Sequence, residues 1–117
     1  MAANLKIAQF QKLNPVIHEK TRLAIMTFLI SAHDASFSEV KSELNLTDGN
    51  LNLHMKVLEK HGYTNVEKAF VSRRPRTTYQ VTEEGLRAFQ EYVSLLERIL
   101  KISRRGGRPA AGRTPAP

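Results

Sequence analysis

Residues 37–62 predict two short helices joined by a tight turn. Ser38 is a candidate N-cap of the first helix. Thr47 is a candidate N-cap of the second, which runs from Asp48 to His61 and stops at Gly62, a residue that readily takes the left-handed conformation found after many helices. Two capped helices in this order have the layout of a helix-turn-helix, around which the rest of the chain has to pack.

Beyond Gly62 the apolar pattern changes from the period of a helix to the alternation of a strand. Residues 63–67 and 78–81 alternate and are rich in β-forming side chains. Between them lies Ser-Arg-Arg-Pro-Arg-Thr at 72–77, in which the proline is expected to break regular structure. These residues predict a two-stranded β-hairpin with a basic loop.

The N-terminal part of the chain predicts two helices. Residues 4–13 indicate a short one. A longer helix is expected to follow Asn14 and Pro15, because asparagine caps helices and proline fits the first helical turn, and it runs to about Ala32.

The C-terminal part predicts one long helix and a tail. Thr82 is the candidate cap of this helix, which reaches about Ile102. Residues 103–117 consist mostly of glycine, proline, alanine and arginine, which offer nothing to pack, so we expect a disordered basic tail. Residues 1–102 then form one domain with flanking dimerisation helices.

The charge balance is strongly basic. There are 18 lysines and arginines against 11 aspartates and glutamates, a formal net charge of +7. Such an excess favours a polyanionic partner, nucleic acid before acidic membrane, although a soluble protein can also simply be basic. The chain has no cysteine, which excludes disulfides, thiolate metal sites and cysteine redox sensing. With no apolar segment of membrane-spanning length and no secretory signal, we expect a cytoplasmic protein without a membrane partner.

The second helix of the motif carries a polar face of unusual composition. Leu51, Met55 and Leu58 share one face and are expected in the core. The opposite face carries Gly49, Asn50, Asn52, Leu53, Lys56 and Lys60. Amides pair with adenine edges, lysine with phosphate or guanine, and an exposed leucine with the thymine methyl group. The alternative is an ordinary solvated face with one stray leucine.

The hairpin loop concentrates positive charge. Arg73, Arg74 and Arg76 crowd the loop around Pro75, and Lys68 lies nearby on the preceding strand. Like charges so close together repel one another unless a polyanion neutralises them. The loop is therefore predicted to follow DNA phosphates or to place an arginine in the minor groove, the alternative being a solvated basic turn.

The chain resembles the winged-helix transcriptional regulators of the MarR/ArsR type in two runs, LNLHMKVLEKHGY at 51–63 and RRPRTTYQVTEEG at 73–85. The resemblance implies an α+β, mainly α fold: a winged helix-turn-helix with a two-stranded hairpin wing and a C-terminal dimerisation helix. It also implies that residues 48–61 lie in the major groove and that residues 71–77 form the wing. Thr47 and Thr77 complete the predicted DNA-binding set.

Nothing in the sequence indicates catalysis, a cofactor or a metal. His54 and His61 have no partner at the spacing of a helical zinc site, so packing or capping is the expected role of each. No phosphate-binding, nucleophile or dinucleotide motif is present, and we expect no enzyme. The chain lacks the longer flanking helices that enclose a ligand cleft in full-length MarR proteins, so a small-molecule effector is not indicated.

The last helix is apolar on two sides. One stripe contains Leu86, Phe89, Val93, Leu96 and Leu100, and the second contains Tyr92, Leu95, Ile99 and Ile102. We expect the first stripe to serve the protomer's own core and the second to form a homodimer interface. The alternative is that residues 4–13 cover the second stripe within one protomer.

These features together predict a sequence-specific regulator of transcription that binds double-stranded DNA, as a dimeric repressor. The rival hypothesis is a winged-helix module for protein or RNA interaction. The arginines of the hairpin loop favour DNA, because the centre of an ordinary protein interface is depleted of charge.

Overall fold

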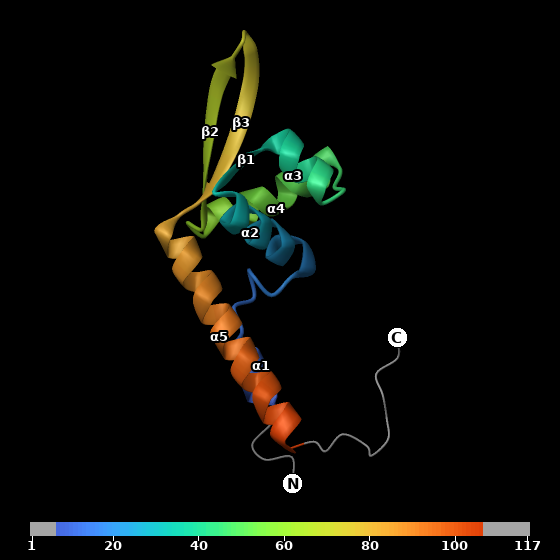
Figure 1. The fold of residues 1–117 in the computed structure, drawn as a ribbon, viewed down its shortest axis with the longest axis vertical. Coiled ribbons are helices and arrows are strands. Elements are labelled where there is room, and N and C mark those ends of the chain that lie inside the picture. Colours follow the sequence, from blue (N-terminus) through green and yellow to red (C-terminus); the bar gives the residue numbers. More distant parts are fainter. Residues whose placement is uncertain (1–6, 107–117) are drawn as a thin grey trace.

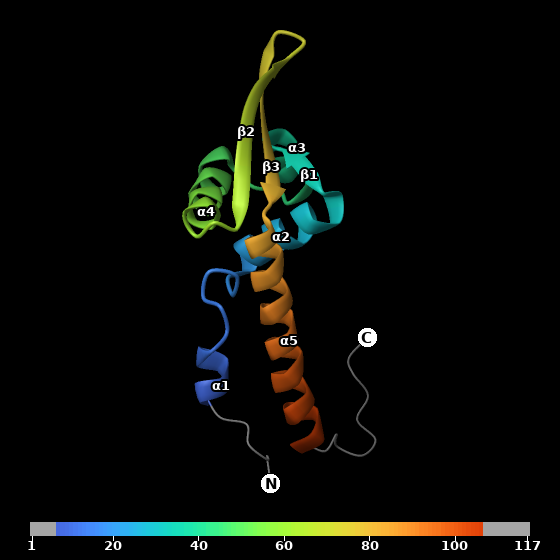
Figure 2. The ribbon, with the colours of Figure 1, turned by 90° about the vertical axis from the view of Figure 1, so that its left-hand side faces the viewer.

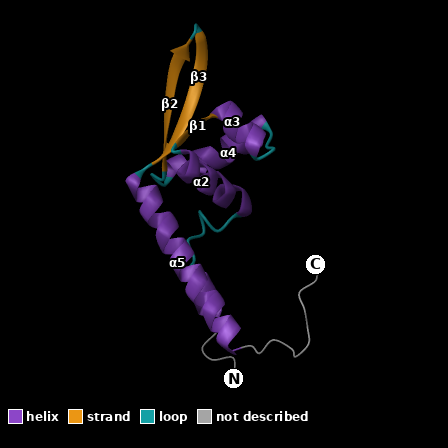
Figure 3. Ribbon diagram, viewed as in Figure 1, coloured by secondary structure: helices purple, strands orange, loops and turns teal. Residues whose placement is uncertain are grey.

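The computed structural model describes residues 7–106 of the chain. Helices and a small sheet follow one another in the order α1 (Ile7–Gln11), α2 (Lys20–Ala32), β1 (Asp34–Ser36), α3 (Phe37–Glu43), α4 (Asp48–Lys60), β2 (Thr64–Val71), β3 (Arg74–Val81) and α5 (Glu83–Gly106) (Figures 1 and 3). The helices α2, α3 and α4 form a compact head. The β2–β3 ribbon and α5 project from this head in opposite directions, as both ribbon views show (Figures 1 and 2).

The helix predicted from Pro15 begins only at Lys20. Asn14 caps a separate turn, because its side-chain oxygen accepts hydrogen bonds from the amides of the two residues after the proline, at 2.9 and 3.2 Å. Glu19 is extended, and its carboxylate caps α2 by accepting the amide of the third helical residue at 2.8 Å. Ile17 is fully buried against α5, and this burial draws the chain away from the axis of α2.

A third short strand, β1, leads into α3 and was not predicted from the sequence. Ser36 rather than the predicted Ser38 caps α3. The Ser36 hydroxyl accepts the amide of Glu39 at 3.1 Å, and the Glu39 carboxylate accepts the amide of Ser36 at 2.8 Å. This reciprocal capping box satisfies two amides at once, and the Ser-x-x-Glu spacing at 36–39 is its sequence signal.

The helix-turn-helix has the predicted turn, and its second helix has the predicted cap and end. The turn between α3 and α4 passes through Asn45 in the left-handed region, at φ 54°. Thr47 caps α4, its hydroxyl accepting the amide of Asn50 at 3.1 Å. Gly62 follows the helix with φ 77°. The predictions for the turn, Thr47 and Gly62 are confirmed.

The wing belongs to a three-stranded antiparallel sheet with the order β1-β3-β2, one strand more than predicted. The strands β2 and β3 pair from Thr64 and Val81 at the base to Val71 and Arg74 at the tip. The connection is therefore the two-residue turn 72–73, whose residues have φ 53° and 67°, and not the predicted six-residue loop.

Pro75 lies inside β3, although it was expected to break regular structure. Val71 and Arg74 flank a two-residue turn and form a hydrogen-bonded pair, so the next pair, Phe70 and Pro75, is a non-hydrogen-bonded one. The nitrogen of Pro75 faces away from β2, and β1 pairs with β3 only at 78–80. No neighbouring strand needs a donor at this position, which is why proline is tolerated.

The junction of α4, the sheet and α5 depends on Thr82 and Gly85. Thr82 donates its amide to the Tyr63 carbonyl at 3.0 Å and its hydroxyl to the Gly62 carbonyl at 2.6 Å. The same hydroxyl accepts the amide of Gly85 at 2.9 Å, so Thr82 caps α5 as predicted. A Cβ atom at Gly85 would overlap the carbonyl oxygen of Tyr63. The Thr-x-x-Gly spacing therefore fixes the position at which α5 leaves the sheet.

Two apolar clusters hold the fold together. The larger one joins α2, α3, α4 and the sheet around Ile25, Leu29, Met55 and Tyr79. The smaller one joins α5 to the segment between α1 and α2. In the part of the chain that the structure describes, no helix combines the length and apolar character needed to span a membrane.

The smaller cluster contains part of the second stripe of α5, for which a dimer interface was predicted. Tyr92 and Ile99, 4% and 1% exposed, are buried against Leu13 and Ile17 of the same chain. Two of the four predicted dimerisation residues are thus buried within the protomer, by Leu13 of the segment 4–13 and by Ile17, which lies beyond that segment. The helix predicted at 4–13 is described over Ile7–Gln11, and its first three residues lie outside the described part.

At its two ends, the first stripe of α5 is more exposed to solvent than the second stripe. Leu86 and Leu100 are 39% and 50% exposed, whereas the stripe was expected to lie in the core. In the second stripe, Leu95 and Ile102 are half-buried. The helix continues four residues past its predicted end, to Gly106, and the predicted tail beyond this residue lies outside the described part.

Candidate nucleic-acid interface

The two faces of α4 differ as predicted. Leu51, Met55 and Leu58 are buried in the larger cluster. The predicted DNA-binding residues of the helix and its cap are all exposed: Thr47, Gly49, Asn50, Asn52, Leu53, Lys56 and Lys60. Except for the Thr47 hydroxyl, which caps α4, the polar groups of these side chains are open to a partner.

A groove separates α4 from the base of the wing. Asn52 and Lys56 line it from α4, and Lys68 and Thr77 line it from the two strands of the hairpin. Its volume is about 360 Å³. Glu59 of α4 adds one carboxylate to the lining, and apolar residues of the larger cluster, including Tyr79, complete it. Tertiary structure thus brings amide, ammonium and hydroxyl groups from separate elements to one concave surface. Lys68 was noted in the sequence, but its position opposite Lys56 was not predicted.

The wing carries different side chains on its two faces. Side chains alternate along a strand, so Lys68 and Phe70 share the face of Val66, which lies toward the groove. Their cross-strand partners on this face are Thr77 and Pro75. Phe70 was not singled out from the sequence, although the apolar run Ala-Phe-Val at 69–71 next to the arginines is its signal.

The three wing arginines do not share one loop. Arg73 lies in the turn, while Arg74 and Arg76 lie in β3 on the face opposite to the groove. Arg76 donates from Nη2 to Oε1 of Glu39 at 3.4 Å, with both side chains about half exposed. Hydrogen bonds from Ser36, together with the charge of Arg76, lower the pKa of Glu39. Its carboxylate stays ionised and offsets part of the charge of Arg76, which leaves Arg73 and Arg74 as the open charges of the tip.

Gly49 has no packing role inside the protein. A Cβ atom built on it meets no atom within 4 Å. Glycine allows a close backbone approach, but no other part of the described chain makes one at this position. The open space lies on the exposed face of α4.

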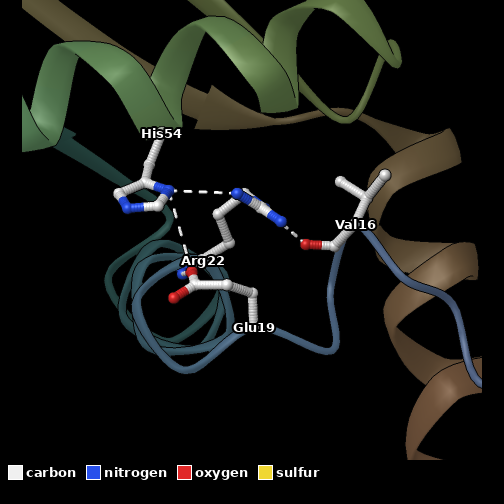
Figure 4. Close-up of polar contacts among 4 residues, drawn as sticks. All are labelled: Val16, Glu19, Arg22 and His54. Carbon is white, nitrogen blue, oxygen red and sulfur yellow. Dashed lines mark hydrogen bonds and ion pairs between the residues drawn. The ribbon is translucent and has the colours of Figure 1, made fainter.

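His54 ties α4 to the beginning of α2, a contact that the sequence did not reveal (Figure 4). Its Nδ1 lies 3.1 Å from Nη1 of Arg22 and 3.7 Å from Oε1 of Glu19. Arg22 also donates from Nε to the Val16 carbonyl at 2.6 Å. Because a guanidinium group only donates, Nδ1 is the acceptor in the contact with Arg22. The half-buried histidine thus fixes α4 to α2 and to the turn before it.

Glu19 balances the charge of Arg22 beside His54. Burial alone would raise the pKa of Glu19, but hydrogen bonds from the amides of Arg22 and Thr21 and the nearby charge of Arg22 lower it overall. His61 occupies the C-cap of α4, with Nδ1 3.0 Å from the Val57 carbonyl. Within the described residues, no group of three or more histidine, aspartate or glutamate side chains could hold a metal ion.

Comparison with known proteins identifies the family. A model of the winged helix DNA-binding domain matches residues 21–100, so the chain belongs to this family. The winged-helix resemblance and the mainly α winged helix fold drawn from the sequence are confirmed. An uncharacterized protein of Methanocaldococcus jannaschii, MJ0432, is 33% identical over 89 residues, which cover 76% of this chain and 94% of the relative.

Solved structures agree with this assignment. A transcriptional regulator homologue from Pyrococcus horikoshii superposes with a TM-score of 0.74 at 32% identity, covering 81% of this chain and 93% of that one. BpsR of Bordetella bronchiseptica, whose DNA binding is regulated by 6-hydroxynicotinic acid, has a TM-score of 0.63 at 18% identity, with 89% and 79% covered. The second likeness shows the fold alone.

Proposed function

We propose that this chain is a sequence-specific regulator of transcription, which binds duplex DNA as a homodimer and represses by occupying its site. The groove between α4 and the wing carries the proposal, because it places Asn52 and Lys56 beside Lys68 and Thr77. The family and the resemblance to a Pyrococcus horikoshii transcriptional regulator homologue support it. The role is one of binding, without catalysis.

In this proposal α4 enters the major groove. Asn50, Asn52 and Leu53 then face base edges, while Lys56 and Lys60 contact phosphate or guanine. The open space at Gly49 lets the DNA backbone approach the first turn of α4. Arg73 and Arg74 at the tip of the wing contact phosphates further along the duplex, and Arg76 contributes less because Glu39 offsets its charge.

A homodimer is proposed through the first stripe of α5. Leu86, Val93 and Leu100 recur every seven residues, the repeat of a helix–helix seam, and the outer two are well exposed. Leu96 and Phe89 flank this line at the intermediate positions. Because α5 and the wing project from the head in opposite directions, this seam is remote from the tip of the wing (Figures 1 and 2). This seam replaces the one first predicted around Tyr92 and Ile99.

Arg73→Ala combined with Arg74→Ala is expected to weaken binding to every duplex. The slope of log K against log salt should flatten by roughly 0.9 for each phosphate that the variant no longer neutralises. Fluorescence anisotropy with duplexes of fixed length at several salt concentrations measures this slope. Arg98→Ala on the exposed charged side of α5 is the matched control and should leave the slope unchanged. An unaltered slope in the double variant would remove the wing tip from the interface.

Asn52→Ala is expected to lower affinity for the preferred site by about 1–3 kcal/mol and to change binding to random DNA little. The reason is that a base-edge contact carries sequence information, whereas a phosphate contact does not. The preferred site is obtained by selection from a random library. Lys60→Ala is the control, and it should weaken both kinds of binding together. Equal losses on both DNAs for Asn52→Ala would show that this residue does not read sequence.

The same measurements test the rival hypothesis of a protein or RNA interaction module. A wild-type chain that selects no duplex sequence and binds structured RNA at least as tightly as DNA would contradict the proposed function. Binding to duplex DNA that is both salt-dependent and sequence-dependent would support it.

A further inference from the structure

The tip of the wing exposes an apolar side chain among basic ones. Phe70 is 78% exposed, the most open of the large apolar residues that the structure describes. It pairs across the ribbon with exposed Pro75, one step from the turn that carries Arg73. An aromatic side chain left in water at the end of a projecting ribbon gains free energy only when a partner covers it.

The direction of Phe70 follows from the register. Phe70 lies on the same face as Lys68, whose side chain lines the groove beside α4. Val71 is also exposed, at 52%, but it pairs with Arg74 on the opposite face. The tip therefore has one aromatic face, on the side of Lys68 and the groove, while the opposite face carries Val71 and the long side chain of Arg74.

The charges around this apolar face select its partner. Lys68 on the same face and Arg73 in the turn lie within two residues of Phe70 or of Pro75, and Arg74 lies on the opposite face of the tip. No acidic residue is present between 68 and 81. A partner has to offer negative charges at its surface and stacked apolar groups directly behind them. Duplex DNA has this arrangement, with phosphates bordering a groove whose floor is the edges of stacked bases.

We propose, resting on the proposed function, that Phe70 backed by Pro75 is an apolar wedge that enters the minor groove and partly unstacks one base step beside the site read by α4. The wing reaches well beyond α3 and α4, so the step lies outside the segment that α4 contacts (Figure 1). Unstacking is least costly at pyrimidine–purine steps, which are the most flexible. The wedge would thus add a preference for TA or CA steps at positions that no polar side chain reads.

Phe70→Ser and Val71→Ser form a matched pair for the test, because they remove exposed apolar groups from opposite faces of the same tip. The probe is a duplex selected by the wild-type chain from a random library, with 2-aminopurine placed at successive positions. We expect wild-type binding to raise the fluorescence at one flanking step. Phe70→Ser should abolish this rise and weaken binding on the order of 10-fold. Val71→Ser should keep the rise and bind within about twofold of the wild type.

The outcomes separate the wedge from the proposed function. If the wild type binds its duplex and Phe70→Ser gives the same affinity and fluorescence, the wedge is wrong and the proposed function stands. If the wild type binds no duplex, both are overturned. Vesicles containing phosphatidylserine provide a third arm: Phe70-dependent binding to them, with DNA binding independent of Phe70, would assign the tip to lipid and overturn the wedge.

Discussion

Replacing Gly85 by alanine is expected to lower the free energy of unfolding by about 3 kcal/mol or more. The new Cβ would overlap the carbonyl oxygen of Tyr63, which is backbone and cannot rotate away. The same carbonyl accepts the amide of Thr82, and Thr82 caps α5, so any shift that relieves the overlap disturbs the start of the helix. Urea denaturation followed by circular dichroism measures the change.

Gly49→Ala is the matched control, because Gly49 also lies in the first turn of a helix. Its Cβ points into open space, and alanine favours helix, so stability should rise by up to about 1 kcal/mol. If Gly85→Ala lowers the free energy of unfolding and Gly49→Ala raises it, the loss at Gly85 is due to the overlap with Tyr63. A Gly85→Ala variant as stable as the wild type would contradict the close approach of α5 to the sheet.

Leu86→Glu combined with Leu100→Glu is expected to convert a dimer into a folded monomer. Both side chains are exposed in the protomer, so the variant should keep its fold, while two carboxylates per chain face their symmetry mates across the seam. A monomer offers α4 to one half-site only, instead of two about 10–10.5 bp apart. Affinity for the specific site should fall on the order of 100-fold or more.

Light scattering measures the oligomeric state of the variant, and gel-shift titration with the selected duplex measures its affinity for DNA. Arg87→Gln with Ser94→Glu changes the charge by the same amount on the exposed polar side of α5 and should leave the dimer intact. A wild type that is monomeric at tens of micromolar, or a Leu86→Glu/Leu100→Glu variant that stays dimeric, would rule out this seam.

A glutamate at Ile99 cannot test the dimer interface, although Ile99 was predicted to lie in it. It is buried between α5 and the N-terminal segment, so glutamate at this position would place a charge in the protomer's core. We therefore expect Ile99→Glu to unfold the chain rather than to dissociate a dimer, which circular dichroism distinguishes directly.

Features that depend on neighbouring residues could be predicted from the sequence alone. Thr47 and Thr82 cap helices and Gly62 is left-handed, because caps and turns satisfy backbone groups within a few residues. The two faces of α4 also follow from the sequence, since the helical repeat alone separates Leu51 from Leu53. The Ser-x-x-Glu box at 36–39 is equally local, and the prediction of Ser38 was wrong because it took the second of two nearby serines as the cap.

Features that depend on a distant partner required the tertiary structure. The turn before α2 and the choice of stripe on α5 both result from the burial of Ile17 against Tyr92, 75 positions away, and helical periodicity contains no information about that contact. The direction of Phe70 was likewise fixed by the register of a ribbon whose turn falls at 72–73, because a shift of one residue would turn every side chain to the other face. Local propensity thus determined where helices and strands form. Long-range burial and strand register determined which of their surfaces remain exposed.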